Sequence, residues 1–192
     1  MRVSLCLGSI GLTVCCLAPA HADRREDIAG LFARAQQAGR VGVARKTRPV
    51  DVRPARSGEI VVTIIAAEGE RRETETQSPP AQEGDMVVRN RCPETGNEEI
   101  LVTAAKFQER YEGPTGPADA NGYRAYRPRG VEMQYFIVRD VDGSFTFEAP
   151  WGEPMIARPG DAIVRNPNDP KDTYRIAAAA FACTYEIVRP AQ

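Results

Sequence analysis

Histidine is nearly absent from this 192-residue chain, which holds only one, at position 21. Tryptophan also occurs once, and there is no excess of charge of one sign, because 25 Lys and Arg residues face 26 Asp and Glu residues. A net charge of −1 argues against the concentrated basic surface that nucleic-acid binding needs, so we expect no nucleic acid as a partner. The hydrophobic fraction of 42% and the charged fraction of 27% are typical of a globular protein.

The first 22 residues have the pattern of an export signal. Arg2 supplies an early positive charge, an apolar stretch follows at 3–17, and Ala-His-Ala at 20–22 has the small-x-small form that a signal peptidase cuts after. The stretch is too short for a membrane-spanning helix, although a retained anchor is the alternative interpretation. We therefore predict that the mature chain starts at Asp23, is periplasmic or secreted, and has no stable membrane insertion.

Removal of this signal would take away the single histidine and three of the five cysteines. A chain without histidine cannot build a Ser-His-Asp or Cys-His nucleophile or a His-containing zinc site. We therefore predict no catalytic residues, no cofactor and no metal. Cys92 and Cys183 remain, and in an oxidising compartment they form either a disulfide bond or two buried small hydrophobic residues. Both alternatives stay open, because a bond requires a Cα separation that the sequence does not reveal.

A repeated pattern organises the rest of the chain. Residues 84–90 read GDMVVRN and residues 160–166 read GDAIVRN, so five of seven positions are identical. A phenylalanine follows the glycine after 23 residues in the first segment and after 21 in the second, each time with Tyr-Glu four residues later. The conserved order of these blocks within one chain predicts an N-terminal helix and linker at 23–45, a first copy at 46–113, a linker at 114–124 and a second copy at 125–192.

Each copy, of about 65 residues, is predicted to be β-rich with one short helical turn. In the second copy, an apolar run at 131–138 and alternating residues at 144–147 flank Asp142-Gly143, which is a strong hairpin signal. Residues 27–38 carry apolar side chains at the i, i+3, i+4, i+7 spacing, which predicts a short helix ahead of both copies. The predicted fold class is therefore mainly β, within the α+β class.

The second copy resembles a known family of small domains. It contains Arg127-Pro128, Trp151-Gly152, Pro159-Gly160-Asp161 and then residues 181–186, and this order is similar to that of the PGDYG family of bacteria and phages. The first copy shares only the Gly-Asp, Phe and Tyr-Glu landmarks. The tyrosine that names the family is Ala162 in the second copy and Met86 in the first. The resemblance implies a fold but no catalytic residues, because no activity is assigned to the family.

Five residues are candidates for ligand binding. Trp151 lies in a loop, where binding residues are common, although packing across the turn is the favoured alternative. Asp85 and Asp161 follow the repeated glycines, where each could hold a cation or a sugar hydroxyl; bonding to the amides of its own turn is the simpler interpretation. Arg89 and Arg165 recur at equal offset and could bind an anion, whereas pairing with a charge on a neighbouring strand is the favoured alternative.

These observations favour a non-catalytic binding or interaction module over an enzyme. Its partner is expected to be an unknown protein or a component of the cell envelope. The alternative is a carboxylate-dependent hydrolase acting on envelope or extracellular polymers, which would need two facing carboxylates about 5 to 10 Å apart in a groove. A binding module would instead show an aromatic or apolar patch.

Overall fold

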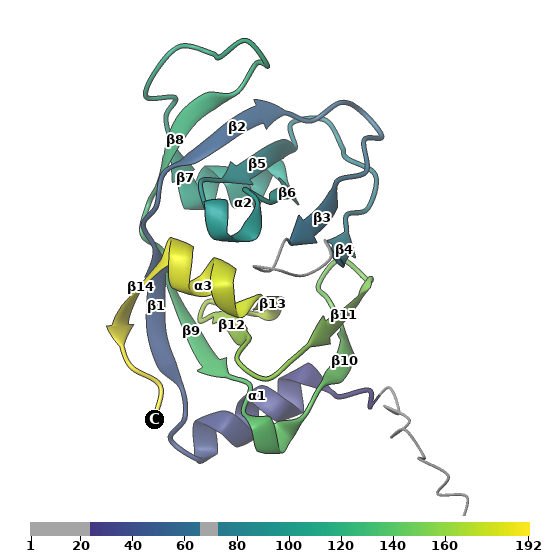
Figure 1. Ribbon diagram of the computed structural model, residues 1–192, viewed down its shortest axis with the longest axis vertical. Coiled ribbons are helices and arrows are strands. Elements are labelled where there is room, and N and C mark those ends of the chain that lie inside the picture. Colours follow the sequence, from purple (N-terminus) through teal and green to yellow (C-terminus); the bar gives the residue numbers. More distant parts are fainter. Residues whose placement is uncertain (1–23, 66–72) are drawn as a thin grey trace, which may run out of the picture.

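The computed structural model describes residues 24–65 and 73–192 (Figure 1). The predicted export signal lies outside these residues. Within the described chain, no helix is long and apolar enough to cross a membrane. The chain forms two five-stranded sheets, two two-stranded sheets and a few short helices. The predicted class, mainly β within α+β, is confirmed.

The first sheet has the strand order β6-β5-β2-β8-β7. Its strands are β2 (Val50–Pro54), β5 (Met86–Asn90), β6 (Glu99–Val102), β7 (Tyr111–Glu112) and β8 (Arg124–Pro128). Val50 and Val52 are buried on one face, because alternate residues of a strand share a face. Helix α2 (Ala104–Arg110) packs there through Phe107. The small sheet of β3 (Val62–Ile65) and β4 (Glu73–Gln77) and the 3-10 turn η1 (Pro93–Thr95) lie beside this sheet.

The second sheet has the strand order β13-β12-β9-β1-β14. Its strands are β1 (Gly42–Lys46), β9 (Glu132–Ile137), β12 (Ala162–Asn166), β13 (Asp169–Ile176) and β14 (Tyr185–Arg189). Helix α3 (Ala178–Thr184) packs on one face through Phe181. The other face is covered by α1 (Ile28–Gln37) and by the hairpin of β10 (Phe145–Glu148) and β11 (Pro154–Ala157).

Helix α1 confirms the N-terminal helix that the apolar spacing predicts. It begins after Asp27, whose carboxylate accepts hydrogen bonds from the backbone amides of Ala29 and Gly30. An aspartate at this position satisfies amides that have no partner within the helix. Leu31 and Phe32 are buried against the second sheet, so the helix is part of the core.

The hairpin predicted around Asp142-Gly143 does not form. Residues 140–142 make a 3-10 turn, η2 (Asp140–Asp142), in which the Asp142 carboxylate accepts hydrogen bonds from the backbone amide and guanidinium of Arg139. The chain is thereby directed away from β9. Consequently β9 pairs with β1 and β12, while β10 pairs with β11.

The two sheets have the same arrangement, but each takes one strand from the other half of the sequence. Four strands of the first sheet have a counterpart at the same place in the second sheet. The corresponding pairs are β2 with β9, β5 with β12, β6 with β13 and β7 with β14. The remaining place in the second sheet is filled by β1, which pairs with β9 and β14. The corresponding place in the first sheet is filled by β8, which pairs with β2 and β7. The exchange is therefore reciprocal, and the chain crosses between the sheets twice (Figure 1).

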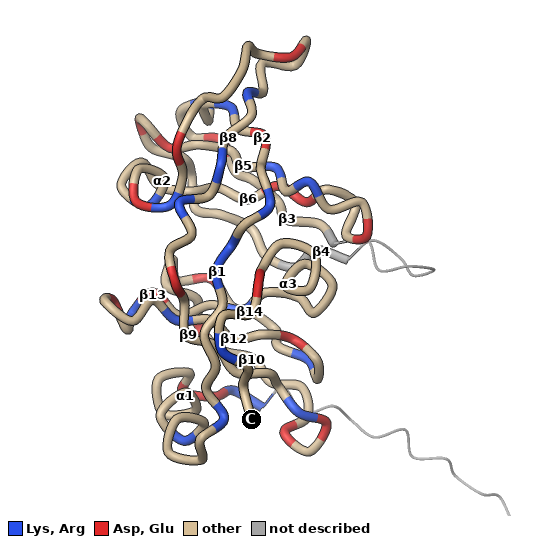
Figure 2. The backbone as a smooth tube through the Cα atoms, turned by 90° about the vertical axis from the view of Figure 1, so that its left-hand side faces the viewer, with Lys and Arg blue, Asp and Glu red and all other residues tan. Residues whose placement is uncertain are grey.

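Residues 42–45, which the sequence analysis assigns to the N-terminal helix and linker, thus belong to strand β1. Figure 2 shows basic and acidic residues interspersed along both halves of the described chain. This distribution agrees with the net charge near zero.

Candidate functional site

A cleft of about 480 Å³ lies between the two sheets, within the volume range of ligand-binding pockets. Residues from both halves line it, and most of the lining is apolar. The apolar wall includes Ile100, Val102, Val131, Met133, Met155 and Ile176. A ligand in this cleft would contact both predicted copies at once.

Trp151 lies in the wall of this cleft. Its ring packs against the core under α1 and lies 6.5 Å, centroid to centroid, from the ring of Tyr174. The indole Nε1 is buried and, in the described part of the chain, has no hydrogen-bond partner. Trp151 therefore has the packing that was favoured from the sequence, and it also forms part of the cleft wall.

The repeated Gly-Asp pairs connect a turn to the start of a helix. Asp85 accepts hydrogen bonds from the backbone amides of Gln82 at 2.9 Å and Ala104 at 3.1 Å. Asp161 accepts the corresponding bonds from Arg158 and Ala178 at the same distances. Ala104 and Ala178 are the first residues of α2 and α3. Both aspartates therefore have the structural role of the simpler interpretation, although Asp85 also lines the cleft.

The backbone of these turns explains the glycine in each pair. Gly84 and Gly160 have φ values of +85° and +91°, a region that residues with a side chain rarely adopt. Asp161 additionally forms a buried ion pair with Arg175, at 2.7 Å. This pair fixes β13 against the turn before β12.

Arg89 and Arg165 do not line the cleft, and both lie over aromatic rings. Arg89 pairs with Asp51 on the neighbouring strand at 3.1 Å and lies 4.1 Å from the ring centroid of Tyr123. Arg165 lies 3.8 Å from the ring centroid of Phe32, and burial lowers the pKa of its guanidinium. Arg89 therefore pairs with a charge on a neighbouring strand, which is the alternative that the sequence analysis favoured over anion binding.

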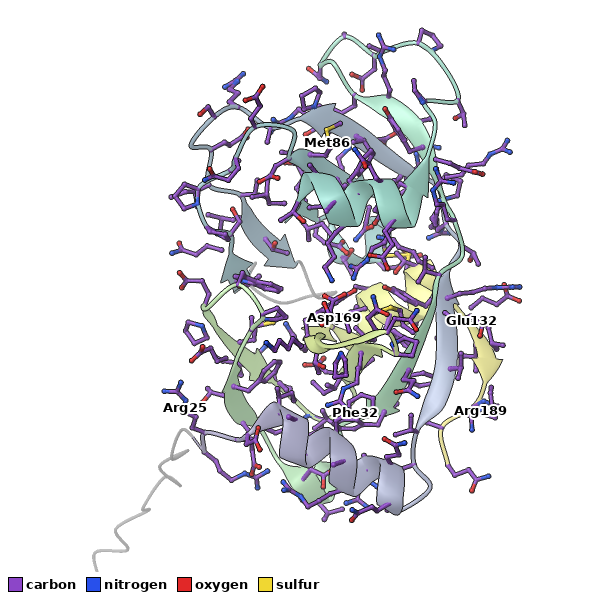
Figure 3. The ribbon with its side chains drawn as sticks, turned by 180° about the vertical axis from the view of Figure 1, so that it is seen from behind. Arg25, Phe32, Met86, Glu132, Asp169 and Arg189 are labelled. Atoms are coloured by element: carbon purple, nitrogen blue, oxygen red, sulfur yellow. A yellow bond between two sulfur atoms is a disulfide. The ribbon has the colours of Figure 1, made fainter. Side chains whose placement is uncertain are left out.

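Several cleft residues were not singled out from the sequence. Arg110 on α2 forms an ion pair with Asp172 on β13 and donates a hydrogen bond to the hydroxyl of Tyr174 at 3.2 Å. Lys106 Nζ lies 2.6 Å from the same Asp172 carboxylate. Asp172 is buried, so these two cations neutralise it and join α2 of one half to β13 of the other. Figure 3 shows Asp169, the first residue of β13, beneath α2 at this junction.

Tyrosine hydroxyls and one lysine complete the polar part of the cleft. Lys46 Nζ lies 2.5 Å from Asn90 Oδ1 and 3.3 Å from the Tyr111 hydroxyl. Of the carboxylates in the described residues, none lies within 4 Å of Lys46 Nζ. Burial raises the pKa of Tyr185 well above its usual value, and Tyr174 adds to this rise. Tyr111 and Tyr185 belong to the Tyr-Glu pairs of the repeated pattern, whereas no sequence pattern marked Lys46.

Cys92 and Cys183 are bonded to each other, with their Cα atoms 6.1 Å apart. Of the two alternatives that the sequence left open, the structure contains the disulfide bond. It joins η1 beside the first sheet to α3 on the second. A carboxylate oxygen of Glu94 lies 3.3 Å from both sulfurs, but oxidised sulfurs have no thiolate to offer a metal.

Comparisons with known proteins found no relative: no family model, curated protein or solved structure matches the chain. The resemblance to the PGDYG family therefore stays a prediction.

Proposed function

We propose that this protein is an exported, non-catalytic binding module whose ligand lies in the cleft between the two sheets. The observation that carries this proposal is the cleft itself, an apolar cavity with a few polar groups that both halves build together. The export signal predicted at 1–22 and the Cys92–Cys183 disulfide support a periplasmic or secreted location. The proposed ligand source is a protein or another component of the cell envelope.

The carboxylates of the cleft support binding over hydrolysis. Asp85 is held by two backbone amides, and Asp172 is neutralised by Lys106 and Arg110. Glu98 is buried and accepts hydrogen bonds from Asn90 and from a threonine hydroxyl. A carboxylate hydrolase needs one carboxylic acid that protonates a leaving group and a second carboxylate that faces it. The cleft carboxylates of the described chain are instead all tied to structural donors.

We further propose that the chain arose as two PGDYG-like copies in tandem. The equivalent strand orders of the two sheets and the equivalent roles of Asp85 and Asp161 support this duplication. Because the copies exchange strands, the binding module would be the pair and not either copy alone.

Photo-cross-linking in cells tests the proposed site. A benzophenone amino acid replaces Thr103, an exposed cleft residue whose side chain makes no cap hydrogen bond, and a control replaces Val141, which is 79% exposed and lies outside the cleft. We expect adducts at position 103 that are absent at position 141, with mass spectrometry identifying the ligand. Equal adducts at both positions, or none at position 103, would overturn the proposed site.

The same preparation tests the export. Mass spectrometry of the intact mature protein should give the mass of a chain that starts at Asp23. A chain that retains residues 1–22 in the isolated envelope fraction would show that the export interpretation is wrong.

A further inference from the structure

Residues of the end strands of both large sheets line the cleft. β6 and β13 are the end strands of their sheets, and the lining includes consecutive residues of each, at 100–102 in β6 and at 174–176 in β13. Successive side chains of a strand point to opposite faces of the sheet. A cavity that is lined by consecutive residues therefore borders both faces of the strand, as a cavity at the outer edge of a sheet does.

An end strand leaves alternate N–H and C=O groups without a ladder partner. In the described chain, β6 pairs only with β5, and β13 pairs only with β12. On β6, the carbonyl of Glu99 accepts a hydrogen bond from the Thr63 hydroxyl at 2.9 Å, and the following residues border the cleft. Backbone groups removed from water need hydrogen-bond partners. These edges therefore favour an occupant that supplies N–H and C=O groups of its own.

A cation lies where β6 begins. Asn90 is the last residue of β5, and its backbone amide donates to the carbonyl of Glu98, the residue before β6. Lys46 donates to the side chain of this Asn90 and, as described above, has no carboxylate in ion-pair contact. The other cleft cations near β13, Lys106 and Arg110, are already paired with Asp172. Of the described cations that line the cleft, Lys46 is thus the one without a carboxylate in ion-pair contact; Asn90 lies between its ammonium and the Glu98 carboxylate, and a ligand carboxylate would complement the ammonium directly.

We propose that the cleft binds an extended, apolar peptide segment that adds as a strand to the edge of β6 and places a carboxylate beside Lys46. The proposal rests on the proposed function and names the ligand class of the same site. Strand addition of this kind obtains affinity from main-chain hydrogen bonds and specificity from pockets for alternate side chains. The apolar wall of the cleft supplies such pockets.

Trp151 makes the test direct, because it is the only tryptophan of the chain and lines the cleft. The probe is a hexapeptide of alternating serine and valine with a free C-terminal carboxylate. One matched peptide carries a C-terminal amide, and another carries N-methyl groups on alternate backbone amides. A third carries the C-terminal amide and one internal glutamate, which separates a terminal carboxylate from a side-chain carboxylate. Titration of the full chain is followed by Trp151 fluorescence and by calorimetry.

We expect the peptide with the free carboxylate to bind, and the N-methylated peptide to bind at least tenfold more weakly, because N-methylation removes strand hydrogen bonds. Lys46→Gln should weaken the peptide with the carboxylate about tenfold or more and leave the amidated peptide unchanged. Lys171→Gln is the matched control, since Lys171 is exposed and lies outside the cleft. The thermal unfolding of each variant shows whether it is folded.

Equal binding of the N-methylated peptide would overturn strand addition. Equal weakening of the carboxylate and amide peptides by Lys46→Gln would overturn the role of Lys46. If no peptide binds while position 103 cross-links to a ligand that is not a peptide, the inference fails and the proposed function stands. If cross-linking at position 103 also fails, both are wrong.

Discussion

Removal of the disulfide should lower the stability of this protein by several kcal/mol. Cys92 and Cys183 are 91 residues apart in sequence, and their bond joins η1 of one half to α3 of the other. We consider the double variant Cys92→Ala, Cys183→Ser. Alanine suits position 92, because this side chain is fully buried, whereas serine suits position 183, which is partly exposed.

The magnitude follows from the length of the closed loop. The bond removes conformational entropy from the unfolded chain, and for a loop of 91 residues the chain-entropy relation gives about 4.6 kcal/mol at 25 °C. Strain in the folded state subtracts from this value, and measured effects reach from about 0 to 5 kcal/mol. We therefore expect the free energy of unfolding to fall by about 3 to 5 kcal/mol. The denaturant midpoint should fall correspondingly, since a small domain has a slope of about 1 to 3 kcal/mol per molar urea.

Urea unfolding followed by Trp151 fluorescence measures this difference. The wild-type chain is measured with and without a reductant, and so is the double variant. Reduction should destabilise the wild-type chain as much as the substitutions do and should leave the variant unchanged. If the two chains unfold within about 1 kcal/mol of each other, the loop reasoning is refuted. If the reductant also destabilises the variant, its effect does not arise from the disulfide.

Three further predictions concern the turns, the ion pairs and the exchanged strands. Gly84→Ala and Gly160→Ala should each lower the free energy of unfolding in urea by about 1 to 3 kcal/mol, because both glycines have a positive φ. Gly84→Ala should have the larger effect, because its new Cβ would lie 3.2 Å from the Ala104 Cβ, whereas the new Cβ of Gly160→Ala would lie 3.6 Å from the Ala178 Cβ. The hydrogen bond from Arg53 lowers the pKa of Glu59 to about 2 from 4.5, so the stability that the ionised Glu59 contributes is complete above about pH 5 and is lost as the pH falls towards 2. In thermal unfolding across this pH range, Glu59→Gln should lose less stability than the wild-type chain, and an equal loss in both would contradict the assignment. Fragments 24–113 and 114–192 should each remain unfolded by circular dichroism, because the first lacks β8 and the second lacks β1, whereas a mixture should regain structure; independent folding of either fragment would refute the exchange.

The local features of the fold could be predicted from the sequence because they depend on short-range physics. The spacing of apolar residues at 27–38 predicted α1, and the repeated Gly-Asp pairs marked two turns that the structure contains. The prediction of a hairpin at Asp142-Gly143 was wrong, because the flanking strands pair with other strands while the turn residues form hydrogen bonds with one another. A turn signal fixes where the chain bends but not which strands become neighbours.

The cleft could not be predicted, because its residues come from segments without any common sequence pattern. Lys46, Arg110 and Asp172 lie on β1, α2 and β13, and the packing of the two sheets against each other brings them together. Of the five residues proposed from the sequence, Trp151 and Asp85 line the cleft, and Asp161, Arg89 and Arg165 do not. The repeated Gly-Asp pairs were prominent for a structural reason, since each of the two sheets has the same turn.

Arg89 and Arg165 each contact the segment that leads into an exchanged strand, but their aromatic partners differ. Arg89 on β5 lies over the ring of Tyr123, which directly precedes the exchanged strand β8, and Arg165 on β12 lies over the ring of Phe32, in the helix before the exchanged strand β1. In each sheet, the arginine therefore contacts the segment that leads into the strand contributed by the other half. A contact between a cation and an aromatic face contributes about 0.5 to 2 kcal/mol, the larger values where it is withdrawn from water; the Arg89 side chain is 28% exposed. The two arginines thus make equivalent contacts, whereas the aromatic partners differ, because α1 supplies Phe32 and the residue directly before β8 is Tyr123.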